Sequence, residues 1–264
     1  MNSGASKHKT KSDFEARATK EMNEHLARPE QWTITQKLAL TARILAAEGH
    51  GSALAGQVTA RGETPKTMWT AKFGLGLDEI NASDFILVDD DLIVLEGTGM
   101  PNPSNRFHLW IYRARADVAC VVHTHPPNVS ALAMIGVPLI ASHMDTAMFF
   151  EDCAWLPEWP GPPIGDEEGD LITTALGDKR SILLAHHGQL CAGETVEQAA
   201  VLAFHFERAA KMQLQAMAAG EIKPLPPEAG RHAHDYRLKE APLNATFDYY
   251  ARKVLRRDGE GVLA

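Results

Sequence analysis

Apolar residues in the first part of the chain recur at helical spacing and then give way to short extended runs. From Ile34 to Leu45 the spacing predicts a helix, and Thr33 with Gln36 predicts a capping box at its start. Two glycines end this helix. β-Branched and aromatic residues then predict four short strands, at 57–61, 67–73, 85–88 and 92–95, the last two joined as a hairpin.

Helical and extended patterns alternate through the middle of the chain. Residues 102–115 predict a helix with Asn102 as its cap and Pro103 at its first position. The run VACVVHTHPP at 118–127 predicts a buried strand, which two prolines end because proline has no backbone N–H to donate. Further elements are expected at 128–135 (helix), 137–141 (strand), 166–177 (helix) and 181–185 (strand).

A long helix is expected from Thr195, with Gln198 as its capping partner, to Gly220. Residues 32–221 therefore alternate helices and strands, as one layered domain does. This order, with its early hairpin, predicts an α/β fold whose sheet is mixed or antiparallel rather than doubly wound and parallel.

The two ends of the chain differ from this domain in composition. Residues 1–31 are dense in lysine, glutamate and arginine, which predicts a solvated N-terminal arm that is helical in part. Residues 222–264 mix prolines, charges and aromatics, which predicts a C-terminal extension in contact with a neighbouring subunit. Its candidate anchors are Phe247, Tyr249 and Tyr250.

Size, charge and cysteine content limit the partners. The 264 residues, 45% of them apolar, can bury a full core. A balance of 26 basic against 34 acidic residues provides neither a basic stripe for nucleic acid nor a polybasic membrane anchor. No apolar run approaches the roughly 18 residues of a membrane span. Three scattered cysteines without a CxxC pair predict reduced, structural thiols. We therefore expect a cytoplasmic protein, and the charge balance makes a small molecule the expected partner.

Histidines follow two of the predicted strands. His123 and His125 stand two residues apart, so they project from the same face with Cα atoms about 6.6 Å apart and could reach one cation. Structural or surface histidines are the competing explanation of such a pair. A second strand ends in His186 and His187, of which only one can point the same way, and three histidines plus an open position are typical of catalytic zinc.

The run NRFHLWIYRARADVACVVHTHPP, followed by SILLAHHGQLCAGETVEQAA, resembles the class II aldolase/adducin family, which includes L-fuculose-phosphate aldolase. The similarity extends over about residues 35–219. It implies a three-layer α/β/α sandwich with a mostly antiparallel central sheet, and a homotetramer with active sites at subunit contacts. It also implies a divalent metal, usually zinc with manganese or iron as alternatives, held by His123, His125 and His187.

The sequence departs from the family's aldolases at several positions. Ser104 stands where those aldolases carry a glutamate that shuttles protons, and His186 stands where the family typically has asparagine. The turn that cradles a phosphate is also altered, at Gly56 and Gln57. These differences count against a sugar phosphate and predict a divergent branch of the family. The resemblance, which extends to family members that decarboxylate aromatic or hydroxy acids, implies a small hydroxy or keto acid as the substrate.

Other residues must then move protons and bind the substrate. The candidates for acid–base catalysis are Asp145, His186 and His108. The candidates for substrate binding are Ser104, Asn105, Arg106 and Gln57. Packing within a helix, capping of a turn and surface ion pairing are the structural alternatives for His108, Asp145 and Arg106.

The leading hypothesis is a metal-dependent lyase that cleaves a C–C bond, by retro-aldol cleavage or decarboxylation, through a metal-stabilised enolate. One alternative is a mononuclear non-heme iron oxygenase, in which Asp145 or Glu151 would complete the ligand set. Another is a noncatalytic, adducin-like assembly module. Retention of all three histidine positions counts against the module, because a scaffold does not need them.

Overall fold

One eight-stranded sheet forms the centre of the molecule, in a computed structural model that describes residues 10–26, 32–162 and 164–264. The strand order is β4-β3-β2-β1-β5-β8-β7-β6, and every neighbouring pair is antiparallel except β6 with β7. The strands are β1 (Gln57–Arg61), β2 (Thr67–Ala71), β3 (Phe85–Asp89), β4 (Val94–Glu96), β5 (Cys120–Thr124), β6 (Cys153–Leu156), β7 (Ser181–Leu184) and β8 (Gly188–Gly193).

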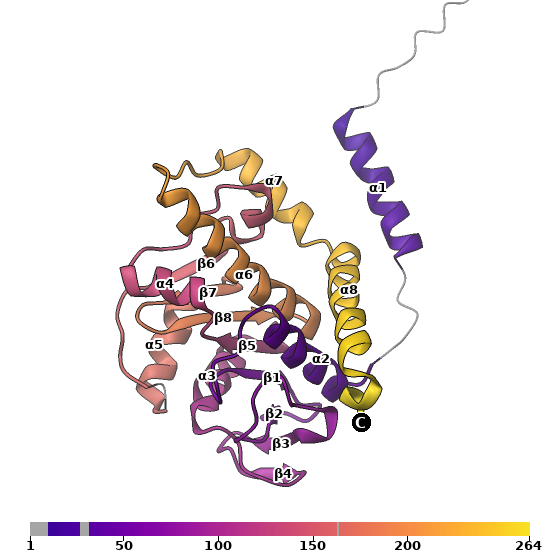
Figure 1. Cartoon of the computed structure of the whole chain (residues 1–264), viewed down its shortest axis with the longest axis vertical. Coiled ribbons are helices and arrows are strands. Elements are labelled where there is room, and N and C mark those ends of the chain that lie inside the picture. Colours follow the sequence, from indigo (N-terminus) through magenta and orange to yellow (C-terminus); the bar gives the residue numbers. More distant parts are fainter. Residues whose placement is uncertain (1–9, 27–31, 163) are drawn as a thin grey trace, which may run out of the picture.

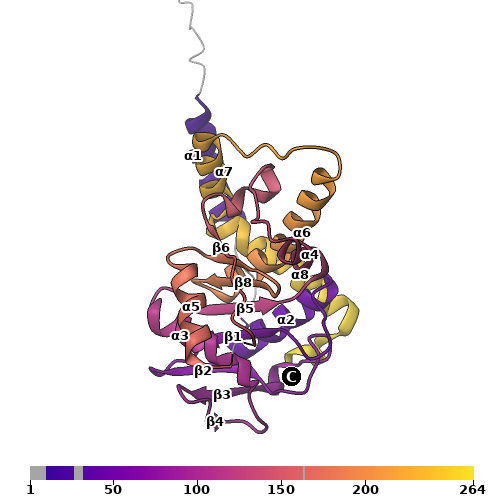
Figure 2. The ribbon, with the colours of Figure 1, turned by 90° about the vertical axis from the view of Figure 1, so that its left-hand side faces the viewer.

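Helices cover both faces of this sheet (Figure 1). In Figure 2, α3 and α5 lie to the left of the sheet, and α2, α4, α6 and α8 lie to the right. The predicted α/β/α sandwich with a mostly antiparallel sheet is confirmed. The helices are α1 (Lys11–His25), α2 (Ile34–Ala47), α3 (Arg106–Ala114), α4 (Pro127–Ile135), α5 (Asp166–Leu176), α6 (Val196–Met217), α7 (Pro227–Arg237) and α8 (Glu240–Asp258), with 3-10 helices η1 (Ala82–Asp84), η2 (Pro103–Asn105), η3 (Met144–Phe149) and η4 (Glu260–Leu263).

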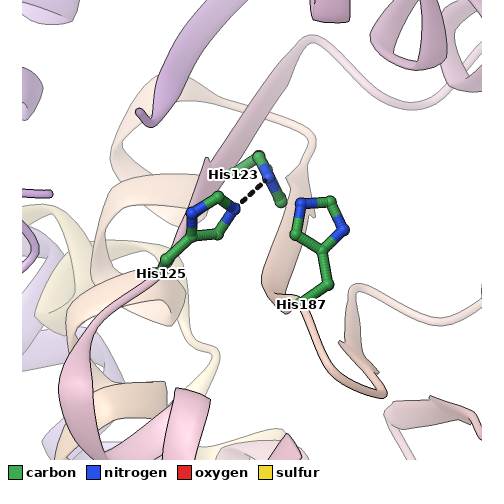
Figure 3. Close-up of side chains that lie close together, drawn as sticks. All are labelled: His123, His125 and His187. Atoms are coloured by element: carbon green, nitrogen blue, oxygen red, sulfur yellow. Dashed lines mark hydrogen bonds between the residues drawn. The ribbon is translucent and has the colours of Figure 1, made fainter. Parts of the chain in front are cut away.

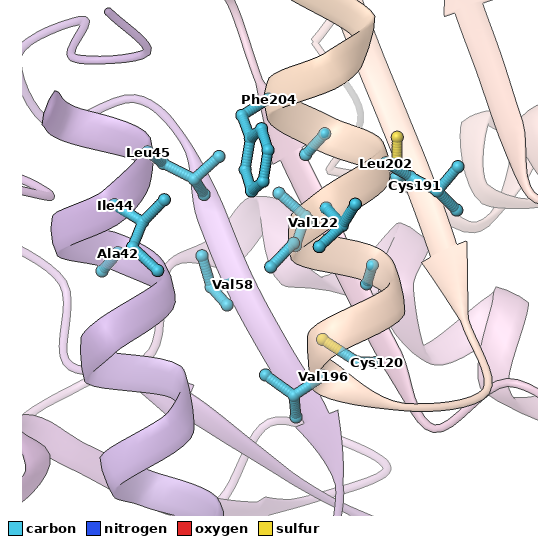
Figure 4. Packing of buried hydrophobic residues seen from close by; sticks show 14 of the residues in the cluster. Ala42, Ile44, Leu45, Val58, Cys120, Val122, Cys191, Val196, Leu202 and Phe204 are labelled. Carbon is cyan, nitrogen blue, oxygen red and sulfur yellow. The ribbon is translucent and has the colours of Figure 1, made fainter. Parts of the chain in front are cut away.

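Alternate residues of β5 enter two separate cores. Cys120 and Val122 pack among α2 and α6 in the larger core, part of which Figure 4 shows. Val121 points to the other face and packs with residues of α3 and α5. Side chains of a strand alternate between faces, so a strand buried on both sides reads as a continuous apolar run. The run that precedes His123 thus places the candidate site between the two helical layers.

Local sequence signals located the starts of α2 and α6 and the end of α4. The side chain of Thr33 accepts a hydrogen bond from the backbone N–H of Gln36, and the side chain of Gln36 accepts one from the backbone N–H of Thr33, which confirms the capping box. The hydroxyl of Thr195 accepts from the backbone N–H of Gln198 at the start of α6, whereas the Gln198 side chain accepts from the backbone N–H of Glu194 rather than that of Thr195. Gly136 ends α4 in the left-handed conformation. Capping needs only contacts along the chain, so it can be read from sequence.

The strand expected at 137–141 is wrong. Those residues form no strand, because the side chain of Gln213 on α6 binds their backbone instead. The Gln213 amide accepts from the N–H of Ile140 at 2.7 Å and donates to the carbonyl of Pro138 at 2.9 Å. Proline offers no N–H to a ladder. The edge of the sheet on this side is β6, which pairs in parallel with β7.

The C-terminal residues pack on their own chain. Phe247 of α8 is wholly buried and meets the ring of Trp32 edge-on, with centroids 6.2 Å apart. Full burial of such a ring contributes about 1.5–3 kcal/mol. Its expected role as an anchor for a neighbouring subunit is therefore wrong, whereas Tyr249 is 49% exposed.

The N-terminal arm is helical where it is described. No residue of α1 is buried, which fits a solvated helix, and Lys239 donates from the C-terminal region to the hydroxyl of Thr19. The rest of the predicted arm, 1–9 and 27–31, lies outside the described residues. Within the described part of the chain, no helix is both long and apolar enough to cross a membrane.

Candidate metal centre

Three histidines from two strand ends converge at one rim of the sheet (Figure 3). His123 lies in β5, His125 follows that strand, and His187 lies in the turn between β7 and β8. The ring centroids of each pair lie 4.7 Å apart. One nitrogen from each ring lies within 4.8 Å of those of the other two, and this is the group that could hold a metal ion among the described residues.

Hydrogen bonding presents the Nε2 lone pair of His123 to this centre. Its Nδ1 lies 2.8 Å from the carbonyl oxygen of Gln189, which can only accept, so Nδ1 carries the proton. The Nε2 of His125 lies 2.9 Å from the Nε2 of His123 and donates to it. A cation bound here would replace that proton, as metal sites do. A carbonyl behind a histidine ligand is also the usual device that orients its ring.

Burial keeps the three rings neutral. It lowers the pKa of His123 well below the usual range, and His187 and His125 lower it further. It also lowers the pKa of His125, and it lowers the pKa of His187 to about 4, with His125 contributing. Neutral imidazole is the form that ligates metals, so the donor set is ready at neutral pH. Three imidazoles suit zinc, and they also suit iron.

Glycine is required where the second strand end approaches the first. A Cβ on Gly188 would lie 2.6 Å from the Cδ2 of His125 and 2.6 Å from the carbonyl oxygen of Thr124. Real Cβ atoms do not approach so closely, so any side chain would push the two strand ends apart. The HHG sequence thus provides both a histidine and the space that lets it reach His125.

A buried polar network lies behind the histidines. The side chain of Gln189 donates to the hydroxyl of Thr124 and to the carbonyl of Ala203 on α6, at 3.0 Å each. The Thr124 hydroxyl also lies 2.9 Å from Nδ1 of His50. Because the backbone of Gln189 holds His123, this network connects the ring to the long helix.

The segment after His125 is fixed by α6 as well. The carboxylate of Glu207 accepts from the backbone N–H groups of Asn128, at 3.0 Å, and Val129, at 2.9 Å. These N–H groups belong to the first turn of α4, where a negative charge is favourable. His125 is therefore followed directly by an anchored helix start.

The carboxylates proposed from sequence lie elsewhere. Asp145 pairs with Arg208 at 2.9 Å, and this partner lowers the pKa of Asp145. Glu151 is exposed and pairs with Arg231 at 3.0 Å. Neither belongs to the group that could hold a metal among the described residues. His186 is exposed in the turn, with the left-handed φ of +55° that asparagine tolerates best after glycine.

The other candidates lie near β1 and at the start of α3. Gln57 stands directly opposite His123 in the ladder and is 9% exposed. Asn105 and His108 are wholly buried. Ser104 and Arg106 are half-buried at the junction of η2 and α3. The structure thus brings Gln57 beside the three histidines and places Asn105 and His108 beneath the same rim.

Several residues of this region were missed from sequence. Thr59 shares a face of β1 with Gln57, and its hydroxyl lies 2.8 Å from both Nδ1 of His108 and the hydroxyl of Tyr112. Their spacing from two predicted residues, Gln57 and His108, could have indicated both. Thr59 is two residues after Gln57 on a strand, and Tyr112 is one helical turn after His108.

Comparison with known proteins defines the family. The profile of the Class II Aldolase and Adducin N-terminal domain matches residues 36–214, so the chain belongs to this family. The fold is similar to that of L-fuculose 1-phosphate aldolase from Glaciozyma antarctica PI12, with a TM-score of 0.81 and 26% identity over 90% of this chain and 98% of that one.

Two bacterial relatives are more similar in sequence. Each is 32% identical over 181 residues, or 67% of this chain. One is 4-hydroxy-3-prenylphenylpyruvate oxygenase/4-hydroxy-3-prenylbenzoate synthase of Streptomyces roseochromogenus subsp. oscitans, of which 65% is covered. The other is Decarboxylase NovR of Streptomyces niveus, of which 67% is covered.

Proposed function

We propose that this protein is a divalent-metal-dependent lyase that cleaves a C–C bond of a small hydroxy or keto acid. The observation that carries the proposal is the convergence of His123, His125 and His187, with one nitrogen from each ring within 4.8 Å of the others. These three side chains would hold the ion, with zinc as the first choice. An adducin-like scaffold would not need three neutral imidazoles that converge in this way, one of them buried and two partly buried.

The ion would act as a Lewis acid, stabilising the negative charge that develops on a substrate oxygen as the C–C bond breaks. The chain's own contribution is to hold the rings in one protonation state and one orientation. The Gln189 carbonyl fixes His123, and the N–H groups bound to Glu207 fix the segment after His125. The candidates for proton transfer are His108, His186 and Asp145, and those for substrate contact are Gln57, Ser104, Asn105 and Arg106.

The substrate class follows from the absence of the aldolase glutamate and from the relatives. By the resemblance, Ser104 stands where the family's aldolases carry that glutamate, and a serine cannot act as a carboxylate base. The relatives from Streptomyces carry the names of a decarboxylase and of an oxygenase that acts on an aryl pyruvate. We therefore favour decarboxylation of a hydroxy or keto acid over cleavage of a sugar phosphate.

The test is a product assay on protein loaded with Zn²⁺, Mn²⁺ or Fe²⁺. A panel of 2-hydroxy and 2-keto acids, aryl acids included, is screened for carbon dioxide and aldehyde under anaerobic conditions. We expect metal-dependent product in the wild type and in His232→Ala, a matched histidine on α7 that lies outside the group. His123→Ala and His187→Ala are expected to be inactive. Equal product with and without bound metal would contradict the proposal.

An oxygen-dependent reaction at the same centre is the second candidate. The similarity to a protein named as an oxygenase favours it. Iron would be held by three histidines here, because Asp145 and Glu151 are paired elsewhere. Product formation with Fe²⁺ that requires dissolved oxygen, with measurable oxygen uptake, would select this reaction over the anaerobic one.

We also propose a homotetramer, as the family resemblance implies. Light scattering of the purified chain tests it directly, and a monomer at micromolar concentration would contradict it.

A further inference from the structure

Two buried side chains at the start of α3 each leave a polar atom without a partner. Asn105 and His108 are both wholly buried. Within the described residues, Oδ1 of Asn105 and Nε2 of His108 make no hydrogen bond. A buried polar group that lacks a partner costs about 1–3 kcal/mol, so native proteins rarely leave one unpaired. Two such atoms on residues three apart therefore call for a hydrogen-bonding partner that the described residues do not supply.

The register of the sheet places these side chains next to each other. Thr59 of β1 and Thr70 of β2 are direct partners in the ladder, so their side chains share a face about 4.5–5.5 Å apart. Nδ1 of His108 lies 2.8 Å from the hydroxyl of Thr59, and Nδ2 of Asn105 lies 2.7 Å from the hydroxyl of Thr70. Asn105 and His108 are also three residues apart, the spacing of neighbours on a helix.

Asn105 presents an acceptor. The hydroxyl of Thr70 donates to the carbonyl of Ala71 at 3.3 Å. It must therefore accept from Asn105, which assigns the near atom of that amide as the nitrogen. The other atom, Oδ1, is the unpartnered one, and a carbonyl oxygen can only accept.

His108 presents a donor. Burial lowers the pKa of His108 to about 3, so the ring carries a single N–H. Burial also raises the pKa of Tyr112 well above its usual range, so its hydroxyl keeps a proton. Donation from Tyr112 to Thr59 and from Thr59 to Nδ1 of His108 uses each hydroxyl proton once. The ring proton then lies on Nε2, the unpartnered nitrogen.

We propose that Nε2 of His108 and Oδ1 of Asn105 bind one hydroxyl oxygen, which accepts from the first and donates to the second. A hydroxyl, of a water molecule or of a substrate, matches this pair, whereas a carboxylate would face the amide oxygen unfavourably. The side-chain oxygen of Gln57, also buried and unpartnered, lies on the same face of β1 as Thr59 and opposite His123. The hydroxyl site therefore adjoins the three histidines.

This site goes beyond the proposed function, because it does not require the metal. A crystal structure of the protein at about 1.5 Å resolution, free and soaked with mandelate, tests it. We expect an oxygen within hydrogen-bonding distance of both atoms in the free protein. If the mandelate hydroxyl replaces this oxygen, the site takes the hydroxyl of a bound hydroxy acid. If the oxygen stays, the site holds a resident water. Both outcomes support the proposal. A gap without an oxygen would overturn it.

The direction of the donor is tested separately by ¹⁵N NMR of protein labelled at histidine. We expect the Nε2–H tautomer of His108 in the wild type and its loss in Thr59→Val, which removes the middle hydroxyl. Thr41→Val is the matched control, since Thr41 is an equally buried threonine whose hydroxyl donates to the backbone carbonyl of Lys37 within α2. A wild-type His108 protonated at Nδ1 would overturn the proposal, whether or not the protein binds metal.

Discussion

The carbonyl oxygen of Gln189 lies 2.8 Å from Nδ1 of His123. Through this bond, β8 determines which nitrogen of a β5 histidine faces the candidate metal centre. The side chain of Gln189 also donates a hydrogen bond to the carbonyl of Ala203 on α6. We therefore expect the stability of the sandwich and the affinity for a metal to be coupled through Gln189.

The first prediction concerns that coupling. Gln189→Met removes the side-chain hydrogen bonds to Thr124 and Ala203 while keeping the volume similar. We expect the free energy of unfolding to fall by about 1–3 kcal/mol and zinc affinity to fall about 10–100-fold. Denaturant unfolding and competition with a zinc chelator measure the two effects. Gln213 is also a buried glutamine, and Gln213→Met, which removes its part-buried hydrogen bonds at 138–140, should lower stability alone. Equal loss of zinc affinity in both variants would contradict the coupling.

A methyl group at Gly188 should disturb the candidate metal centre by steric overlap. The Cβ of Gly188→Ala would lie 2.6 Å from the backbone carbonyl of Thr124, which cannot move without moving the strand end. We expect a stability loss of about 1–3 kcal/mol and zinc affinity lowered about 10-fold. Gly220→Ala is the control, because no atom lies within 4 Å of its Cβ. Unchanged zinc affinity in Gly188→Ala would show that the two strand ends need not be close.

His186 offers a stabilising substitution. Its φ of +55° is left-handed and its side chain is exposed, so His186→Asn should unfold with equal or higher free energy, by up to about 1 kcal/mol. Zinc affinity should not change. Thermal unfolding and zinc titration check this prediction, and lower stability would contradict it. A loss of turnover at unchanged zinc affinity would assign proton transfer to His186.

The docking of α7 should depend on pH. His234 of α7 lies 3.1 Å from the carboxylate of Asp152, and this hydrogen bond raises the pKa of His234. A raised folded-state pKa contributes stability that is fully present below the unfolded value of about 6.5 and is lost as pH rises through the folded value. Burial alone would raise the pKa of Asp152, but its bonds to His234 and Arg180 lower it overall. The carboxylate thus stays ionised over this range.

The corresponding variant is His234→Gln. We expect the difference in unfolding free energy between wild type and variant to be larger near pH 6 than near pH 9. Urea unfolding at the two pH values measures it. A difference that grows with pH would have the opposite sign and would refute this account of α7.

Much of the fold could be predicted from contacts that are local in sequence. The caps at Thr33 and Thr195 and the apolar run before His123 identified their elements correctly. β8 was not predicted, since it begins and ends with glycine and its six residues carry no alternation. The prediction of a strand at 137–141 was wrong because the side chain of Gln213, more than 70 residues later, makes hydrogen bonds with the backbone of these residues.

The candidate site divides in the same way. The i, i+2 spacing of His123 and His125 is a property of the strand itself, so the sequence was sufficient to pair them. The contacts of His108 with Thr59, and of Asp145 with Arg208, depend on how distant elements meet. No spacing along the chain could have revealed that His108 lies beneath the rim or that Asp145 forms an ion pair.

The central claim, that three histidines hold one divalent ion, is tested most directly by metal stoichiometry. Wild type, His187→Ala and the control His232→Ala are dialysed against zinc and then against buffer, and analysed by mass spectrometry for bound metal. The account predicts about one zinc per chain in the wild type and control, and affinity lowered on the order of 100-fold or more in His187→Ala. A wild type that retains no metal, or a His187→Ala variant that binds zinc as tightly, would contradict it.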